Sequence, residues 1–443
     1  MSTKRLSSAV VGTTLLASIL HAPVAEAATT TASVTLPLAH YSRILADPVH
    51  HHLFITEGTG YNTVLVTDYA GTVVATLDNE PGATGLVISP DGNTVYVGLA
   101  DAGAVSAIST RSLTEVSRYA TGDGTSPTYV AYTAGKIWFS YESDYQGMIG
   151  SIDPHTSPAK VVLAASPDTW GIPPVLAANR DGELVAGEPS QSPNELASYD
   201  VSSGAVVVLA PQVFEYEAGN MGDLQITPDG SDVVVASGAP YHHEVFKVSD
   251  LSTAGEYDTA TYPNSVAIAA DGTVIAGSEN YYGDSIYVFA PGRSAAVTSY
   301  PLPPTTYLAP AGLAVTPDGN KLFAITADPY GNSPVVLNII ARPEQTSSTL
   351  TLSGPTQVHE HKPIAVSGTL GGASPYTAGQ VLCVTRVSSN GKTAVLPDVV
   401  TAADGSFSFT DTPRGAGTVT YRVSYVGSAH LTASSASITI PID

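Results

Sequence analysis

The chain has 443 residues, of which only 13% are charged, yet its formal net charge is −22. Such a chain lacks the clustered Lys and Arg residues that neutralise phosphates, which argues against nucleic acid and anionic membranes as partners. A cation, a basic protein or an uncharged ligand is electrostatically easier to bind.

The first 27 residues are expected to form a secretory signal peptide (1–27). Lys4 and Arg5 give a basic start, Ala9 to Leu20 form a short apolar core, and Ala25-Glu26-Ala27 fits a cleavage site. The alternative, a membrane anchor, is disfavoured because the apolar run is too short to span a bilayer comfortably. We therefore expect cleavage after Ala27 and a secreted, extracellular protein with no membrane span.

One hairpin phrase recurs along residues 28–341. In Gly312 to Thr326 (GLAVTPDGNKLFAIT), two apolar runs flank an Asp-Gly turn. Val, Leu, Phe and Ile favour strands, and Gly takes positive φ in tight turns. Copies of the phrase turn near residues 50, 92, 135, 182, 230, 272 and 319. A period of about 45 residues predicts the blades of a seven-bladed β-propeller.

The ends of this region complement each other. The last repeat has three strands, because Val335 to Ile340 runs directly into Arg342-Pro343. A blade has four antiparallel strands. Ala32 to Leu38 (32–38) belongs to no repeat, so we predict that it closes the ring as the outer strand of the seventh blade. The alternative, two stacked β-sandwiches, rarely keeps one hairpin phrase at a fixed period.

A polar linker (342–349) separates the propeller from a C-terminal region with a different phrase. Residues 350–443 contain seven short apolar runs, with hairpin turns at Asn390-Gly391 and Asp404-Gly405. This predicts an immunoglobulin-like β-sandwich. The single cysteine, Cys383, lies in the run Val381 to Val384, where we expect it to be buried.

These phrases resemble known repeats. Gly85 to Gly98 (GLVISPDGNTVYVG) is similar to the YVTN-type propeller repeat, a relative of WD repeats. Ala402 to Pro413 and Thr418 to Tyr425 resemble a bacterial Ig-like repeat domain. The combination resembles secreted actinobacterial proteins. It implies an all-β chain that serves as a monomeric, non-catalytic binding or interaction module.

Acids and tyrosines recur on one face of the predicted ring. We call this face the rim; it consists of the loops between blades and the loops between second and third strands. An acid ends the second strand in six repeats: Glu57, Asp101, Glu142, Glu188, Glu279 and Asp328. A tyrosine precedes the third strand in five: Tyr61, Tyr145, Tyr241, Tyr282 and Tyr330. Trp170, Tyr216 and Tyr307 lie in the loops between blades.

Two interpretations of this pattern stay open. The carboxylates can cap backbone N–H groups of their own turns, and the tyrosines can pack on neighbouring blades. Alternatively, the carboxylates hold a cation such as calcium, and the aromatic faces bind a carbohydrate or a peptide.

Histidines give a further candidate. His242, His243 and Glu244 lie on the rim beside Tyr241, where they could ligate a metal or form an acid–base pair. His50-His51-His52 is expected to be a solvated turn on the opposite face.

Polar groups are scarce on the strands expected to line the central channel. Only Arg43 and Asp223 bring charge there, which weakens the case for an enzyme. We therefore expect a secreted, non-catalytic protein whose rim binds an extracellular glycan or protein, with the Ig-like domain as spacer or adhesive module. The alternative is a propeller enzyme of lyase or lactonase type.

Overall fold

The computed structural model describes residues 30–215, 218–259, 261–280, 283–291, 293–303, 306–328, 333–341, 346–373, 376–413, 415–425, 431–432 and 434–443. The expected signal peptide, 1–27, lies outside these residues. No helix in the described part of the chain has the length and apolar character needed to cross a membrane.

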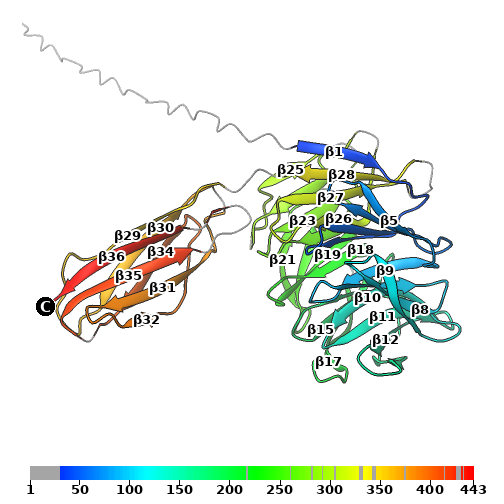
Figure 1. The fold of residues 1–443 in the computed structure, drawn as a ribbon, viewed down its shortest axis with the longest axis horizontal. Helices are drawn as coiled ribbons and strands as arrows, with labels where there is room; N and C mark the ends of the chain where they lie inside the picture. The colour runs from blue at the N-terminus through cyan, green and yellow to red at the C-terminus, as the bar shows by residue number, and fades with distance from the viewer. Residues whose placement is uncertain are drawn as a thin grey trace, which may run out of the picture.

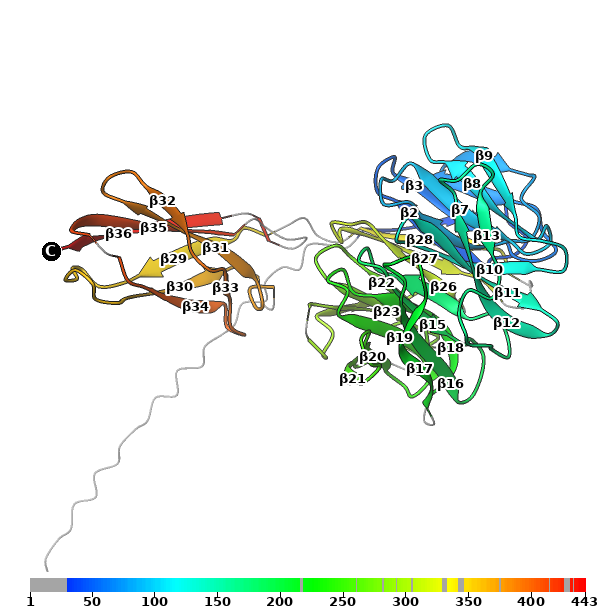
Figure 2. The ribbon, with the colours of Figure 1, turned by 90° about the horizontal axis from the view of Figure 1, so that it is seen from below.

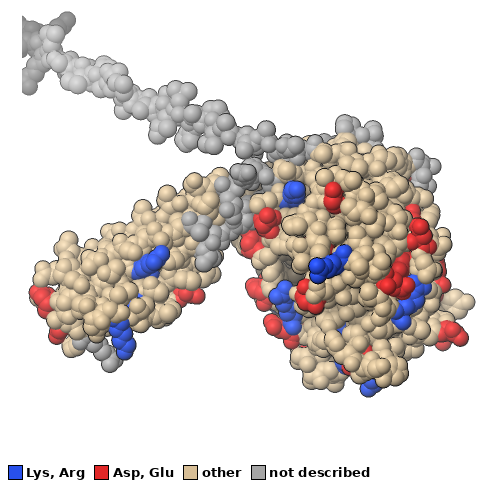
Figure 3. Space-filling view, in the orientation of Figure 1, with Lys and Arg blue, Asp and Glu red and all other residues tan. Residues whose placement is uncertain are grey.

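The described residues confirm the predicted all-β fold, with seven four-stranded antiparallel sheets arranged as propeller blades (Figures 1 and 2). On the face shown in Figure 3, acidic and basic side chains are interspersed over the propeller, and most of the surface is uncharged.

The first six blades each consist of four strands that follow one another in the chain. Blades 1 to 3 contain β2 (Arg43–Asp47), β3 (His52–Thr56), β4 (Val64–Asp68) and β5 (Val73–Leu77); β6 (Ala83–Ile88), β7 (Thr94–Leu99), β8 (Ala104–Ser109) and β9 (Thr114–Ala120); β10 (Ser126–Thr133), β11 (Lys136–Ser143), β12 (Gln146–Asp153) and β13 (Lys160–Val162). Blades 4 to 6 contain β14 (Val175–Ala178), β15 (Glu183–Gly187), β16 (Asn194–Asp200) and β17 (Val207–Glu215); β18 (Gly219–Ile226), β19 (Asp232–Ala239), β20 (His243–Lys247) and β21 (Thr253–Tyr257); β22 (Pro263–Ile268), β23 (Val274–Ser278), β24 (Ile286–Phe289) and β25 (Thr298–Tyr300).

The repeated Asp-Gly phrase forms the first hairpin of a blade, as predicted. In blade 2, Asp91 accepts hydrogen bonds from the Ser89 hydroxyl (2.6 Å) and the Asn93 backbone N–H (3.1 Å). These bonds hold the pKa of Asp91 below its usual value. Gly92 has φ +71°, which a glycine adopts without a steric penalty. Local chemistry therefore fixes the turn.

The seventh blade combines both ends of the propeller region. Its strands are β26 (Leu308–Val315), β27 (Lys321–Thr326), β28 (Val336–Ala341) and, outermost, β1 (Thr30–Thr35). β1 pairs antiparallel with β28, from Thr30 opposite Ala341 to Thr35 opposite Val336. The ring is thus closed by hydrogen bonding between strands about 300 residues apart.

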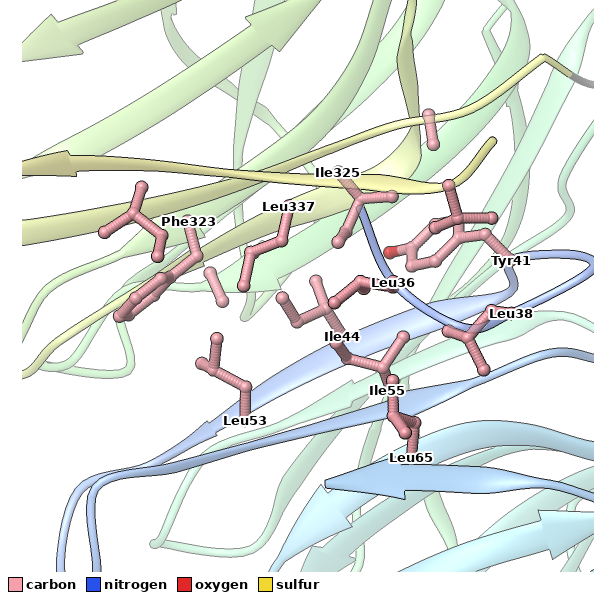
Figure 4. Close-up of a cluster of buried hydrophobic side chains, with 14 of the residues drawn as sticks. Leu36, Leu38, Tyr41, Ile44, Leu53, Ile55, Leu65, Phe323, Ile325 and Leu337 are labelled. Atoms are coloured by element: carbon pink, nitrogen blue, oxygen red, sulfur yellow. The ribbon is translucent and has the colours of Figure 1, made fainter. Parts of the chain in front are cut away.

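The closing strand begins and ends earlier than the predicted range 32–38. Beyond β1, the Leu36 N–H still donates to the Val335 carbonyl (2.9 Å), and the side chains of Leu36 and Leu38 are buried in the core between blades 7 and 1. They pack there with Ile44 and Leu337 (Figure 4). This core anchors the segment that leads from β1 into blade 1.

The C-terminal region has two sheets that resemble a sandwich domain. One contains β29 (Thr349–Ser353), β30 (Ile364–Gly371) and β34 (Ser406–Asp411). The other contains β31 (Val381–Ser388), β32 (Thr393–Val395), β33 (Val399–Val400), β35 (Gly417–Tyr425) and β36 (Ser434–Ile442). A hydrogen bond from the Arg293 guanidinium to the Ala403 carbonyl (3.4 Å) connects the sandwich with the propeller.

The prediction that Cys383 is buried is wrong. Side chains alternate between the two faces of a strand. In β31, Leu382 and Val384 point into the core, with no exposed surface, and Cys383 therefore points outward and is exposed.

The thiol of Cys383 is therefore expected to react with a maleimide in the folded protein, at a rate close to that in urea. Labelling followed by mass spectrometry measures this, with Cys383→Ser as the unlabelled control. Labelling that requires unfolding would contradict the exposed position.

Candidate functional site

At least three of the six rim carboxylates, those of Glu57, Asp101 and Glu188, bind backbone N–H groups. Glu57 Oε1 accepts hydrogen bonds from the N–H of Ala39 (2.8 Å) and of His40 (3.4 Å). Glu188 Oε1 accepts one from the N–H of Ile172 (2.8 Å). Glu57 and Glu188 are buried. Each of these two carboxylates fixes a loop between blades, so it binds backbone N–H groups, but not those of its own turn as the capping interpretation expects.

Asp101 joins neighbouring blades in the same way. Its Oδ2 accepts a hydrogen bond from the N–H of Gly60 (2.6 Å), which lies in blade 1, whereas Asp101 follows the second strand of blade 2. Glu142 is exposed on β11, and Glu279 and Asp328 are half-buried. The six carboxylates therefore do not form one ring of equivalent groups.

The aromatic candidates also divide. Tyr145 is 91% exposed, and Tyr241 is 53% exposed and lies edge-on to Tyr262, with 5.4 Å between ring centroids. Trp170 is 2% exposed and packs in the core between blades 3 and 4, so it has no face to offer a ligand. Tyr216, Tyr282 and Tyr330 lie outside the described residues.

A pocket on the rim gathers several candidates. We call it the rim pocket; its volume is about 420 Å³, and it lies where blades 6, 7 and 1 meet. Its polar lining includes His40, Tyr41, Arg43, Glu279, Tyr307 and Asp328. Leu308, Ala309, Pro310 and Val335 give it apolar surface. Sequence analysis singled out Glu279, Tyr307 and Asp328, which blades 6 and 7 bring together as neighbours along the chain. Ring closure adds the segment that contains His40 and Arg43.

His40 and Tyr41 were not predicted. They belong to the segment between β1 and β2, which enters the rim only because β1 closes the ring. The Tyr41 hydroxyl donates a hydrogen bond to the Ala311 carbonyl (2.6 Å), and burial raises the pKa of this phenol. The only feature of the sequence that could have predicted them is their position directly after the closing strand.

The orientation of His40 fixes its tautomer. Its Nδ1 lies 2.9 Å from the Glu57 carbonyl oxygen, and a carbonyl can only accept, so Nδ1 carries the proton. In the neutral ring, Nε2 is then a hydrogen-bond acceptor. The imidazole also stacks on Tyr61, with 5.6 Å between ring centroids and 9° between ring planes. Tyr61 therefore supports a wall of the rim pocket.

The candidate His242, His243 and Glu244 are not equivalent in the structure. His243 has no exposed surface: its Nε2 lies 3.0 Å from the Ser265 carbonyl oxygen and its Nδ1 lies 3.1 Å from the Thr259 hydroxyl. Burial lowers the pKa of His243 to about 4. His242 lies near the surface, 3.3 Å from Glu256. Among the described residues, no group of three or more His, Cys, Asp or Glu side chains could hold a metal ion.

Comparison with known proteins supports the fold. No protein-family model and no curated protein sequence matches the chain. Among solved structures, hydrazine synthase of Kuenenia stuttgartiensis aligns with a TM-score of 0.53 at 18% identity, over 68% of this chain and 96% of that chain. Kluyveromyces lactis Hsv2 aligns with a TM-score of 0.44 at 10% identity, over 68% and 97%.

A candidate 6-phosphogluconolactonase of Bacteroides uniformis aligns with a TM-score of 0.44 at 17% identity, over 61% of this chain and 89% of that chain. The alignment with hydrazine synthase supports the propeller fold, and identities this low carry no activity over to this chain.

Proposed function

We propose that this chain is a secreted, non-catalytic binding protein of the YVTN-like propeller type, and that its rim pocket binds an uncharged extracellular glycan. The observation that carries the proposal is the rim pocket itself, which places Glu279, Asp328, His40 and Tyr307 around about 420 Å³. Ligand pockets usually measure about 300–1,000 Å³ and combine apolar surface with a few polar groups.

The chemistry of the lining fits sugars. A carboxylate has about four acceptor positions, so Glu279 and Asp328 can accept hydrogen bonds from sugar hydroxyls beside their contacts within the protein. Nε2 of neutral His40 is a further acceptor. The apolar C–H face of a sugar ring can pack against Tyr307. The net charge of −22 disfavours an anionic glycan.

Two other readings have less support. A calcium site that uses the whole rim would have to share Glu57, Asp101 and Glu188 with the backbone N–H groups that they bind. An enzyme working through His243 would need an imidazole that substrate can reach, whereas this ring has no exposed surface.

A glycan array with the mature protein tests the proposal. We expect binding to neutral glycans, and loss of at least about tenfold in affinity in the double variant Glu279→Gln, Asp328→Asn, since both substitutions remove acceptors for hydroxyl groups. Glu142→Gln is the matched control, because Glu142 is an exposed rim carboxylate outside the pocket. Equal binding by the double variant, or no glycan bound by the wild type, would overturn the proposal.

A further inference from the structure

The central channel contains a second cavity, of about 280 Å³. Its walls are the edges of the innermost strands, where polar and apolar atoms are exposed in about equal measure. The apolar part includes the half-buried residues Leu45, Leu86, Ile88 and Ile226, and Arg43, Tyr129, Tyr132, Asp223 and Gln225 also line the cavity. The cavity is therefore of mixed polarity, with two charged side chains.

Arg43, Tyr129 and Asp223 lie at one level of the channel. The residues that follow them, Ile44, Val130 and Leu224, occupy the same place in the first hairpins of three blades. Ile44 pairs with Ile55, Val130 with Phe139, and Leu224 with Val235. Because Arg43 is the first residue of β2, this level is the end of the channel at the rim. Both charged groups thus lie at one end of the channel, and half-buried apolar residues such as Ile226 lie below them, together with Gln225 and Tyr132.

Both charged groups are held in place. The guanidinium carbon of Arg43 lies 5.0 Å from the centroid of the Tyr129 ring, and its Nη1 donates to the Ser42 carbonyl (3.2 Å). Asp223 is only 7% exposed, and its two carboxylate oxygens accept hydrogen bonds from the N–H groups of Leu224 and Val266, each at 3.0 Å. Neither group depends on the other for its position.

The two opposite charges face one cavity without forming an ion pair. In the part of the chain that the structure describes, no side-chain nitrogen of Arg43 lies within 4.0 Å of a carboxylate oxygen of Asp223. Arg43 still interacts with Asp223 through space, because it lowers the pKa of this carboxyl, which burial raises to about 6. A guanidinium has five N–H donors and a carboxylate about four acceptor positions, so both retain capacity for a ligand.

We propose that the channel binds a small zwitterion with an apolar side chain, namely a free aliphatic amino acid. Its carboxylate pairs with Arg43, its ammonium group pairs with Asp223, and its side chain lies against the half-buried Leu86 and Ile226. A simple anion would meet the charge of Asp223, and a simple cation would meet that of Arg43. A molecule that carries an ammonium group and a carboxylate on the same carbon can pair with Arg43 and Asp223 at once.

The size of the cavity supports this class. About 280 Å³ lies just below the usual range of about 300–1,000 Å³ for drug-sized ligands, which favours a small molecule over an oligosaccharide or a peptide. The site is separate from the glycan pocket, although Arg43 lines both cavities. Asp223 lines the channel cavity but not the rim pocket, so a substitution of Asp223 tests the channel by itself.

Isothermal titration of the mature protein with L-leucine tests the proposal, with 4-methylpentanoate, which lacks the ammonium group, and isopentylamine, which lacks the carboxylate. We expect leucine to bind, and each analogue to bind at least about tenfold more weakly, because it leaves one buried charge unpaired. No leucine binding at millimolar concentration, or equal binding of all three compounds, would overturn the proposal.

The variant Asp223→Asn locates the site. We expect it to lose at least about tenfold in leucine affinity and to favour 4-methylpentanoate over leucine, since the negative charge is removed. Glu279→Gln, Asp328→Asn should bind leucine as the wild type does, which separates this site from the rim pocket. Wild-type selectivity retained by a folded Asp223→Asn protein would contradict the assignment. If this variant does not fold, the analogue series on the wild type still decides.

Discussion

A chain that begins at Leu36 instead of Thr30 is expected to melt roughly 10 °C lower and to self-associate. The truncation removes six residue pairs between β1 and β28. At about 1 kcal/mol for each net hydrogen bond, the loss is on the order of 5 kcal/mol. It also deprives Asn338, which is fully buried, of the hydrogen bond that Ser33 donates to its Oδ1 (2.7 Å).

Self-association follows from the new edge. Without β1, the apolar strand β28 (VLNIIA) presents unpaired backbone groups, and an edge of this kind recruits other strands. Calorimetry and light scattering measure both effects, and a chain beginning at Thr30 is the matched control. If the shorter chain stays monomeric and melts like the control, β1 does not hold the ring together.

The fold could be predicted because its signals are local and repeated. An Asp-Gly turn between two apolar runs specifies a hairpin wherever it occurs, and five such turns with two weaker copies, near residues 50 and 135, give the seven-fold period that specifies blades. The strand bounds were less accurate where local chemistry interrupts a run. One of the seven apolar runs in the C-terminal region spans residues 393–400, which predicts a single strand, but Pro397 lacks an N–H group, and the structure has β32 and β33 on either side of it.

The candidate site was predictable only in part. The sequence places acids at the ends of second strands, but whether a carboxylate faces a ligand or a backbone N–H depends on the neighbouring blade. Glu57 is buried because the segment after β1 covers it. That segment is held there by ring closure, which a local sequence pattern cannot predict. Glu279 and Asp328 come from the consecutive blades 6 and 7, but the wall opposite them, which includes His40, is present only in the closed ring.

Acidification is expected to destabilise the propeller through His243. The Nε2 of this buried ring donates to the Ser265 carbonyl, because a carbonyl cannot donate, and the Thr259 hydroxyl then donates to Nδ1. The neutral tautomer satisfies both contacts. Burial lowers the pKa of His243 from 6.5 to about 4, so the unfolded chain takes up this proton at a higher pH than the folded one.

The direction of the effect follows from that difference. The contribution of His243 to stability is complete above pH 6.5 and is lost as the pH falls towards 4, by at most about 3 kcal/mol at ~1.4 kcal/mol per pH unit. Melting temperatures between pH 7 and pH 4 measure it. In His243→Gln, whose side-chain amide can still donate to the Ser265 carbonyl, the loss should be smaller by several degrees. His242→Gln is the matched control, because it changes the neighbouring histidine at the surface and should keep the wild-type pH dependence. Parallel pH profiles for wild type and His243→Gln would mean that the buried imidazole accepts a proton without cost, and His243 would again be a candidate for acid–base chemistry.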